Sequence, residues 1–270
     1  MKAGVTGHPI AHSKSPIIHQ YWMKAHNIKG SYKAIDIAPE NLKDGIKHLI
    51  SENYDGFNIT IPHKQNIMGL CDEIDETAQL IGAVNTVRIY NGKLFGTNTD
   101  AFGFIQNIKT SQSSFDFKNK KILVLGAGGA ARAILYGLLQ EGVAEIILTN
   151  RTIETAKELA KNFQGNITVT PWEKRADLLG DIDLLVNTTS LGMQGKPPLD
   201  IDLGKLNPNA LVNDIVYAPL MTDLLNHAQM RGNPIITGIG MLLHQARPAF
   251  AAWTGIMPDV TAELEAMVLK

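Results

Sequence analysis

The sequence predicts an α/β protein of two domains, the second of them built on a doubly wound parallel sheet. Its 270 residues exceed the roughly 100 to 200 that one domain usually holds. Short apolar runs alternate with helical stretches along the whole chain, which is typical of α/β folds. With 44% hydrophobic and 19% charged residues, the chain has the composition of a protein with a packed core.

Charge and cysteine content narrow the classes of function. The formal net charge is −1 and no run of like charges occurs, so the sequence favours neither nucleic acid nor an anionic membrane as a partner. Cys71, the single cysteine, cannot form an intramolecular disulfide and is interpreted as structural. No signal-peptide pattern and no membrane-spanning stretch is found, so we expect a cytoplasmic protein that acts on small molecules.

The first hundred residues show the α/β pattern in detail. Apolar runs predict strands at Ala3–Thr6, Tyr32–Ile37 and Phe57–Ile61. Helices are expected to begin at Pro16 and Pro39, because proline is favoured in the first turn of a helix. The N-terminal domain is therefore also predicted to be α/β.

A β-hairpin is predicted around residues 91–92, an Asn-Gly pair between two strand-like runs. Both residue types tolerate the positive φ angles that a two-residue type I′ turn requires. A two-residue loop determines the register, so Tyr90 should lie opposite Lys93 and Asn85 opposite Asn98.

Residues 111–119 are polar and aperiodic, and we expect a domain boundary near them. Stronger apolar runs follow, which fit parallel strands covered on both faces: Lys121–Leu125, Glu145–Thr149, Ile182–Val186 and Leu211–Ile215. These runs and the helical stretches between them predict the doubly wound sheet. From Gly238 onward the pattern predicts two helices, with residues 253–255 ending the first and Pro258 opening the second.

A glycine-rich turn follows the first of these strands. Gly126, Gly128 and Ala131 form a G-x-G-x-x-A pattern at the start of an amphipathic helix. Gly126 permits a tight turn, Gly128 lets the backbone approach a pyrophosphate, and the helix N-terminus supplies N–H groups for the phosphates. This context favours a dinucleotide site over an ordinary glycine-rich βα turn.

Arg151 indicates which dinucleotide is bound. It follows the second strand of this unit, where an acidic residue would accept hydrogen bonds from a free ribose 2′-OH and an arginine favours a 2′-phosphate. The sequence therefore favours NADP. The alternative is a solvated arginine that only caps the turn.

Lys64 is the best candidate for a general acid or base. It follows a strand and Pro62, so it is expected in the first turn of a helix, where the positive helix terminus disfavours a cation. On these facts alone, a solvated surface lysine is the alternative. The eight histidines and one cysteine show no metal-ligand spacing, and no metal is expected.

Two further polar clusters are candidates for the site. Asp100 follows the strand that brings Asn98 opposite Asn85, so two amides and a carboxylate gather at one end of a β ribbon. Asp100 is equally suited to cap the helix that follows it. Ser15, just before Pro16, offers a hydroxyl either to a substrate carboxylate or to the helix terminus as an N-cap.

Eight segments resemble the motifs of the shikimate dehydrogenase family, in the order in which that family carries them. They are GHPIAHSKSPIIH, NITIPHK, GAVNT, GTNTDAFGF, GAGGAARA, NRT, DIVYAPLMTDLL and GIGMLLHQARPAFAAWTG. The resemblance runs from about residue 4 to residue 259, and eight ordered motifs are far more specific than any one of them.

The resemblance implies a substrate-binding and catalytic domain at 1–101, a Rossmann-type NADP-binding domain at 102–237 and C-terminal helices at 238–270 that return to the first domain. The active site is expected in the cleft between the domains. The implied reaction is the reversible reduction of 3-dehydroshikimate to shikimate by NADPH, in the pathway of aromatic amino acid biosynthesis. The expected partners are this substrate and NADP, with the chain a monomer or a homodimer.

The family's functional residues carry over by position. Lys64 and Asp100 are implied to be the catalytic pair, the lysine donating or relaying a proton and the aspartate orienting lysine and substrate. The residues implied to contact substrate are Ser13, Lys14, Ser15, Thr60, Asn85, Asp100, Tyr217 and Gln245. Those implied to contact NADP are Glu76, Gly126, Ala127, Gly128, Gly129, Ala130, Asn150, Arg151, Thr152, Ile153, Glu154, Thr155, Ile215 and Gly238.

This chain departs from the family pattern beside the cofactor. Many members carry a second basic residue shortly after the arginine of the NRT motif, where this chain has Glu154 and Thr155, so we expect only a moderate preference for NADP. The nearest alternative is a quinate/shikimate dehydrogenase of relaxed specificity that uses NAD. Another is a nucleotide-dependent binding protein without turnover, against which the intact Lys64 and Asp100 argue.

Overall fold

The structure, a computed structural model, describes residues 1–270 and divides into two compact units. Unit 1 comprises Met1–Gly103 and Leu243–Lys270, and unit 2 comprises Phe104–Leu242. The chain passes between units inside two helices, α4 (Asp100–Ser111) and α8 (Ile239–Thr254). The breaks thus fall after residues 103 and 242, close to the 101 and 237 that the family resemblance implied. The polar stretch at residues 111–119, where the sequence pattern predicted a boundary, lies past the first break, because a helix shows no change of pattern where it leaves one core for another.

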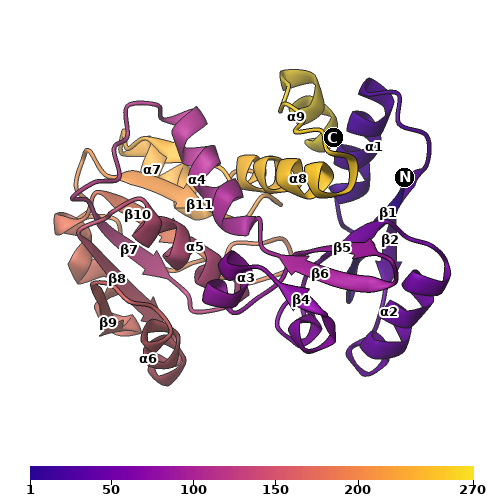
Figure 1. The fold of residues 1–270 in the computed structure, drawn as a ribbon. Coiled ribbons are helices and arrows are strands. Elements are labelled where there is room, and N and C mark those ends of the chain that lie inside the picture. The colour runs from indigo at the N-terminus through magenta and orange to yellow at the C-terminus, as the bar shows by residue number, and fades with distance from the viewer. The chain divides into compact units, whose positions relative to one another are not determined.

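Unit 1 contains a six-stranded mixed sheet in the order β2-β1-β3-β5-β6-β4 (Figure 1). Its strands are β1 (Lys2–Gly7), β2 (Ser31–Asp36), β3 (Gly56–Ile59), β4 (Glu73–Ile74), β5 (Thr86–Tyr90) and β6 (Lys93–Thr97). Strand β1 is parallel to β2 and β3, whereas β5 is antiparallel to β3 and β6. The edge strand β4 was not predicted, because two residues are too few to show alternation.

The predicted hairpin is confirmed in position and register. Tyr90 lies opposite Lys93, and both turn residues have positive φ angles. Beyond the last ladder pair, the Asn85 N–H donates to the Thr97 carbonyl at 3.0 Å. This bond keeps Asn85 and Asn98 side by side at the end of the ribbon, as the turn chemistry predicted.

The helices that lie wholly in unit 1 are α1 (Ser15–Ala25), α2 (Leu42–Ser51), α3 (Glu76–Ile81) and α9 (Ala262–Val268), with short 3-10 segments η1 (Pro39–Asn41) and η2 (Asn66–Leu70). Phe57 and Ile59 of β3 pack in an apolar cluster with α2, η2 and α3. Asn58 points to the opposite face, because side chains alternate along a strand. Rings from α1, β2 and α8 pack together around His19, Trp22, Tyr32, Phe250 and Trp253.

Unit 2 contains a six-stranded parallel sheet in the order β12-β11-β10-β7-β8-β9. Its strands are β7 (Lys121–Leu125), β8 (Glu145–Asn150), β9 (Ile167–Pro171), β10 (Leu184–Asn187), β11 (Leu211–Asp214) and β12 (Ile235–Ile236). The strand order reverses between β7 and β10, which is the Rossmann arrangement. The predicted doubly wound sheet is therefore confirmed.

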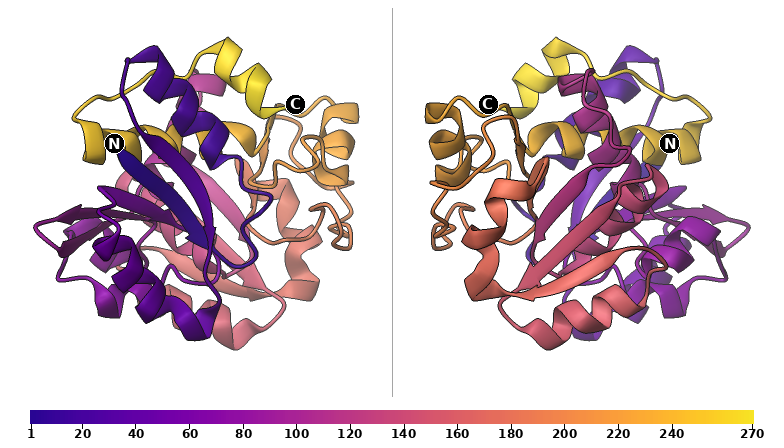
Figure 2. Two further views of the ribbon diagram at one scale, coloured as in Figure 1. Left: turned by 90° about the vertical axis from the view of Figure 1, so that its right-hand side faces the viewer. Right: turned by 90° about the vertical axis from the view of Figure 1, so that its left-hand side faces the viewer.

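Helices cover both faces of this sheet (Figure 2). They include α5 (Gly129–Gln140), α6 (Ile153–Lys161) and α7 (Asp223–Met230), together with the 3-10 segment η3 (Trp172–Asp181). Ile122 and Val124 of β7 pack with α4, α5 and α6, whereas Leu123 and Leu125 pack with η3 and α7. Because both faces are buried, the strands are apolar at successive positions and show no alternation.

The C-terminal region differs from its prediction at one boundary. Helix α8 ends at Thr254, before Gly255, as predicted. Helix α9 begins at Ala262, because the Thr261 hydroxyl accepts the Leu264 N–H at 3.1 Å and so caps the helix. Pro258, predicted to open this helix, lies in the preceding loop.

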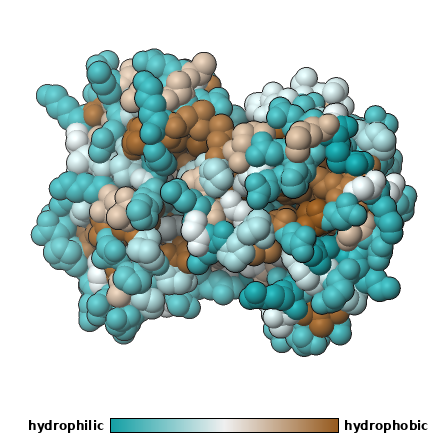
Figure 3. Space-filling model, turned by 180° about the vertical axis from the view of Figure 1, so that it is seen from behind, coloured by the Kyte–Doolittle hydropathy of each residue, from teal (hydrophilic) through white to brown (hydrophobic).

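The surface is mainly hydrophilic on the face that Figure 3 shows, with hydrophobic side chains scattered among polar ones. Two large apolar side chains are especially exposed: Met230, at 76%, and Ile61, at 73%. They belong to separate units. No helix combines the length and the apolar character needed to cross a membrane.

Candidate functional site

The polar residues of unit 1 gather where β1 and β3 end. These strands are parallel, so their carboxyl ends lie at the same edge of the sheet. The segment that follows β1 carries Ser13 and Ser15, and the segment that follows β3 carries Thr60 and Lys64. Asn85 directly precedes β5, which runs antiparallel to β3 and therefore starts at this edge. One edge of the sheet thus collects side chains from three distant segments.

Lys64 lies in a turn rather than in the first turn of a helix, so that prediction was wrong. The 3-10 segment η2 begins only at Asn66, and Pro62 occupies the turn before it. The Lys64 carbonyl accepts the Val84 N–H at 2.8 Å, which ties this turn to the residues before β5. The environment of the lysine is therefore determined by its side-chain partner and not by a helix terminus.

That partner is Asp100. The Lys64 Nζ donates to Asp100 Oδ2 at 2.5 Å, and the side chains are only 18% and 7% exposed. The other carboxylate oxygen, Oδ1, accepts from Asn85 Nδ2 at 2.8 Å. The carboxylate therefore binds side chains and does not cap α4, while the Asn98 amide oxygen accepts the Asp100 N–H at 2.9 Å. A largely desolvated ammonium lies against an acceptor, which suits it to hold and transfer a proton.

Asn85 connects this ion pair to other chain segments. Its Nδ2 also donates to Thr99 Oγ1 at 2.9 Å and to Gln245 Oε1 at 3.4 Å, and its Oδ1 accepts the Thr99 N–H at 2.9 Å. The structure thus brings Lys64, Asn85, Asp100 and Gln245 together. Thr99 was not among the predicted residues, although the TNTD segment places it beside Asp100.

The serines after β1 lie at the start of α1. Ser15 is its first residue and is buried, and no side chain caps this helix, so the reading of Ser15 as an N-cap is wrong. Lys14 occupies the cap position without a side-chain cap bond. The Ser13 hydroxyl accepts the Ser15 N–H at 3.3 Å. The Ser15 hydroxyl therefore remains suited to a ligand or to a neighbouring side chain.

The glycine-rich turn of unit 2 joins β7 to α5. Gly126 has φ +104°, and a Cβ there would approach Thr188 Oγ1 to 2.7 Å, so the fold itself requires glycine. A Cβ at Gly128 or Gly129 would meet no atom within 4 Å. Packing does not explain these two glycines, whereas a phosphate lying close to the N-terminus of α5 does. The turn fits a dinucleotide.

Asn150, Arg151 and Glu154 play different parts at the end of β8. The Asn150 Oδ1 accepts the Ala127 N–H at 3.2 Å and its Nδ2 donates to the Thr152 carbonyl at 2.9 Å, so this residue braces the glycine-rich turn. Arg151 and Glu154 are exposed and form no ion pair with each other.

Ile215, Tyr217 and Gly238 of unit 2 lie in loops at strand ends. A Cβ at Gly238 would lie 2.2 Å from the Ile215 carbonyl oxygen, so these two backbones touch. Tyr217 follows β11, and burial raises the pKa of its hydroxyl. Glu76 lies in unit 1 at the start of α3, whereas the other predicted cofactor residues lie in unit 2.

A buried carboxylate in unit 2 was not predicted. Asp214, at the end of β11, accepts from the Asn187 amide at 3.0 Å, the Val216 N–H at 3.0 Å and the Thr222 hydroxyl at 2.8 Å. It is fully buried without a cation, and this burial raises its pKa. Asp214 therefore ties the loop that leads to Tyr217 to the end of β10 and the start of α7.

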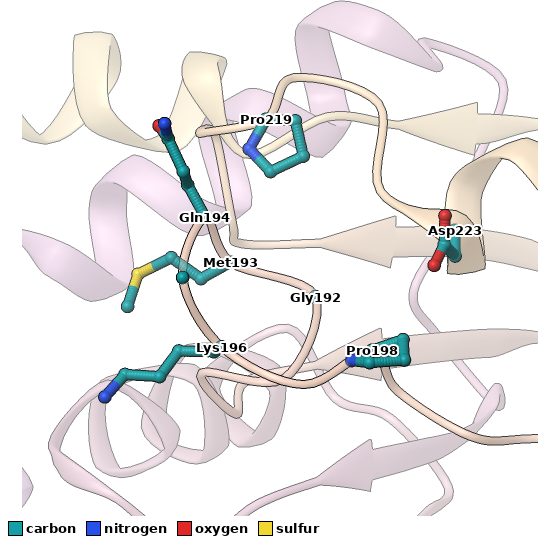
Figure 4. Close-up of a pocket in the computed structure, with 8 residues that line it drawn as sticks. Gly192, Met193, Gln194, Lys196, Pro198, Pro219 and Asp223 are labelled. Atoms are coloured by element: carbon teal, nitrogen blue, oxygen red, sulfur yellow. The ribbon is translucent and has the colours of Figure 1, made fainter.

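A hollow of about 560 Å³ in unit 2 also escaped prediction. In Figure 4 the loop after β10 curves beside Pro219 and Asp223. Its lining residues are Gly192, Met193, Gln194, Gly195, Lys196, Pro198, Pro219 and Asp223. None of the predicted site residues lines this hollow. The one signal that the sequence offers here is the richness of this stretch in glycine and proline, which is typical of a loop.

No group of three or more His, Cys, Asp or Glu side chains is placed to hold a metal ion. Cys71 is half-buried and lies beside Gly96 of β6. Burial raises the pKa of its thiol to about 11. This cysteine is therefore protonated near neutral pH, which fits its interpretation as a structural residue.

Comparison with protein families gives three matches along the chain. Residues 5–87 match the shikimate dehydrogenase substrate binding domain, and residues 109–193 match shikimate / quinate 5-dehydrogenase. Residues 238–267 match the shikimate 5'-dehydrogenase C-terminal domain. The matches thus cover parts of both units.

Individual relatives are similar along their whole length. The shikimate dehydrogenase (NADP(+)) of Paramagnetospirillum magneticum is 47% identical over 99% of this chain and 98% of that protein. Shikimate 5-dehydrogenase of Thermus thermophilus, solved in complex with NADP(H) and shikimate, is 36% identical, with a TM-score of 0.90 over 99% of this chain and 98% of that one. Quinate dehydrogenase of Corynebacterium glutamicum, solved with NAD, is 30% identical, with a TM-score of 0.92 over 100% and 98%.

Proposed function

This chain belongs to the shikimate dehydrogenase family, and we propose that it catalyses the reversible, NADP-dependent interconversion of shikimate and 3-dehydroshikimate. The observation that carries the proposal is the 2.5 Å contact between Lys64 Nζ and Asp100 Oδ2. A protein that only binds a nucleotide needs no such proton-transfer pair. Unit 1 is proposed to bind the substrate and unit 2 the cofactor.

Lys64 and Asp100 are proposed to handle the proton. NADPH, when bound, supplies the hydride that reduces the carbonyl carbon of 3-dehydroshikimate. The Lys64 ammonium donates a proton to the oxygen of that carbonyl and stabilises the negative charge that develops on it. Asp100 holds the ammonium in place through Oδ2 and, together with Asn85, accepts or donates hydrogen bonds at the ring hydroxyls. In the oxidation direction Lys64 takes the proton back.

The remaining residues of unit 1 are proposed to orient the substrate. Ser13 and Ser15 offer hydroxyls to its carboxylate, and Thr60 lies at the same edge of the sheet as Lys64. Gln245 hydrogen-bonds with Asn85 and is proposed to contact a ring hydroxyl. Tyr217 of unit 2 is proposed as a further partner of the carboxylate.

The groups of unit 2 support NADP as the cofactor. Gly128 and Gly129 leave the N-terminus of α5 open to a pyrophosphate, and Asn150 holds the turn in shape. Arg151 is exposed and is not paired with Glu154, so its guanidinium is available to a 2′-phosphate. The acidic residue that reads a free 2′-OH in NAD enzymes is absent at the end of β8.

An absorbance assay tests this function directly. Purified protein is mixed with NADPH and 3-dehydroshikimate, and the loss of NADPH absorbance is followed. Rapid turnover is expected, with shikimate and NADP reacting in reverse. No turnover in either direction would refute the proposal.

The same assay distinguishes the proposed enzyme from a quinate/shikimate dehydrogenase of relaxed specificity that uses NAD. Quinate and NAD are offered in place of shikimate and NADP, at matched concentrations. Curated relatives at 42% to 47% identity are named shikimate dehydrogenase (NADP(+)), whereas the quinate dehydrogenase is 30% identical, so quinate is expected to react poorly. A kcat/KM for quinate equal to that for shikimate would favour the alternative.

Two accompanying proposals concern the protein in solution and in the cell. We place it in the cytoplasm, where its substrate and NADP are available, as a monomer or a homodimer. Light scattering of the purified protein distinguishes these two states. Fractionation of the source cells tests the location.

A further inference from the structure

A line of buried hydrogen bonds crosses the sheet of unit 1 and ends on Asp100. The Tyr32 hydroxyl of β2 donates to Asn58 Oδ1 of β3 at 2.6 Å, and Asn58 Nδ2 donates to Thr86 Oγ1 of β5 at 3.0 Å. The Thr86 hydroxyl donates to Asn85 Oδ1 at 2.9 Å, and Asn85 Nδ2 donates to Asp100 Oδ1 at 2.8 Å. None of the five side chains is more than slightly exposed.

The direction of this line is determined by backbone groups. Asn58 Nδ2 also donates to the main-chain carbonyl of Asn85 at 3.2 Å, and a carbonyl only accepts. Asn85 Oδ1 also accepts the main-chain N–H of Thr99 at 2.9 Å, and an N–H only donates. Each amide therefore has one orientation that satisfies its partners. With both amides oriented, the hydroxyls of Tyr32 and Thr86 must donate, so every donor points toward Asp100.

We propose that Tyr32 and Thr86, linked through Asn58, are positioning residues that hold the Asn85 amide and thereby place Asp100 against Lys64. This inference rests on the proposed function of the Lys64 and Asp100 pair. Aligned hydrogen bonds in a poorly solvated interior polarise one another, and an acceptor at the end of such a line is held more firmly than by one bond alone. Neither Tyr32 nor Thr86 is assigned a contact with substrate.

Burial keeps Tyr32, the first residue of this line, and its neighbour His19 in one protonation state each. Burial raises the pKa of Tyr32 well above its ordinary value, so its hydroxyl remains a donor. His19 stacks on the Tyr32 ring with centroids 4.1 Å apart, and burial lowers its pKa to about 3, so it stays neutral near neutral pH. Neither Tyr32 nor the histidine stacked on it therefore changes charge near neutral pH, and the line acts as a static brace.

Replacing Thr86 tests the proposal, and the sheet offers a matched control. Thr86→Val keeps the shape of the side chain but removes its donor and acceptor, so kcat for shikimate oxidation should fall by about tenfold while KM for NADP stays within twofold. Thr86→Ser should restore most of kcat. Thr6 of β1 is equally buried, yet its hydroxyl has no partner, so Thr6→Val should leave kcat within about twofold.

A double-mutant cycle separates positioning from general destabilisation. If Thr86 acts through Asn85, Thr86→Val should lower kcat no further in an Asn85→Ala background. A tenfold loss in that background as well, or a single Thr86→Val protein with wild-type kcat, would overturn the proposal. If Thr86→Val does not fold, Tyr32→Phe removes only one hydroxyl and should lower kcat by about threefold, with wild-type kcat again contradicting the brace.

A crystal structure of a variant gives a readout that does not depend on activity. In Thr86→Val, or in Tyr32→Phe if that protein is used, Asn85 or Asp100 should shift relative to Lys64. Unchanged geometry would refute the brace even if the enzyme is active. A wild-type protein that does not oxidise shikimate would instead refute the proposed function, so the two failures are distinguishable.

Discussion

Asp100 in unit 1 and Asp214 in unit 2 are both buried carboxylates beside strand ends, and each accepts a hydrogen bond from an asparagine. They differ in their other partners. Asp100 pairs with the Lys64 ammonium, whereas Asp214 is held by neutral groups, the Thr222 hydroxyl and a main-chain N–H. Burial raises the pKa of Asp214, because neutral donors compensate only part of the lost hydration.

The comparison shows that the partners of a buried aspartate determine whether it suits catalysis or only stabilises the fold. A buried carboxylate paired with a lysine keeps a proton donor beside it, which is what a hydride-transfer reaction needs at a carbonyl oxygen. A buried carboxylate among neutral donors connects chain segments and has no mobile charge beside it. We therefore expect changes at Asp100 and Lys64 to affect rate, and changes at Asp214 to affect stability.

The largest expected effect is on the rate. Lys64→Ala removes the proton donor and should lower kcat by roughly 10² to 10⁴, with a smaller effect on KM for shikimate. Steady-state kinetics measures both constants. The matched control is Lys205→Ala, which breaks an exposed ion pair with Asp177 and should leave kcat unchanged. Less than a threefold loss for Lys64→Ala would remove this lysine from the mechanism.

The next effect concerns stability. Asp214→Ala leaves the donors of Asn187, Val216 and Thr222 without their acceptor, so the free energy of unfolding should fall by about 3 kcal/mol. Urea unfolding measures the change. Asp200→Ala, at an exposed aspartate of the same unit, should change it by no more than about 0.5 kcal/mol. Equal losses in both variants would mean that the buried network does not stabilise unit 2.

A smaller effect is expected on cofactor preference when the exposed Arg151 of unit 2 is replaced. Arg151→Ala should lower kcat/KM for NADP by roughly tenfold to a hundredfold, the range of a charge-assisted hydrogen bond to phosphate. The value for NAD should stay within about threefold. Both cofactors are compared at one ionic strength, because salt screens the contact. Equal losses for NAD and NADP would show that Arg151 supports the fold or the adenine pocket instead.

A companion variant refines the cofactor comparison. Glu154→Lys replaces an exposed carboxylate shortly after Arg151 with a cation, and it should raise kcat/KM for NADP without raising that for NAD. The same assay and ionic strength apply. An equal gain for both cofactors would indicate a general attraction of anions rather than recognition of the 2′-phosphate.

The smallest expected effect is a dependence of the free energy of unfolding on pH, caused by Asp214. Its pKa in the folded protein is raised, so the folded state binds the proton more tightly than the unfolded state does. The stability that this proton binding contributes is fully present below the pKa of an aspartate in the unfolded chain, about 4. It is lost as the pH rises through the higher pKa of Asp214 in the folded protein. Relative to Asp214→Asn, the wild type should therefore lose stability as the pH is raised from about 4 through the elevated pKa of the folded protein. A difference that stays constant in urea unfolding across this range would contradict the prediction.

Local chemistry made several features predictable. The hairpin register follows from an Asn-Gly pair, since the turn alone determines which residues face each other. The doubly wound sheet follows from apolar strands separated by helices, and its glycine-rich turn has the positive φ angle at Gly126 that the motif requires. Proline was a weaker guide, because it fits turns as well as first helical turns, and Lys64 proved to lie in a turn.

Tyr32 and Asp214 were not predicted from the sequence, and the physical reason is the same for both. Tyr32 reaches Asn58 although β1 lies between their strands, and Asp214 meets Asn187 and Thr222 from separate loops. Such encounters depend on the order of strands in a sheet and on side chains that turn to the same face. No periodicity or local spacing records that information.

The amino-acid sequence by itself determined the α/β pattern, the hairpin, the dinucleotide turn and the residues that place this chain in its family, because each depends on neighbours along the chain or on ordered motifs. Tertiary structure decided which of its polar groups meet. It set Lys64 against Asp100, left Asp214 among neutral donors and oriented two amides in one direction. The reason is that burial makes an unpaired polar group costly, so packing selects the partners that satisfy every donor and acceptor at once.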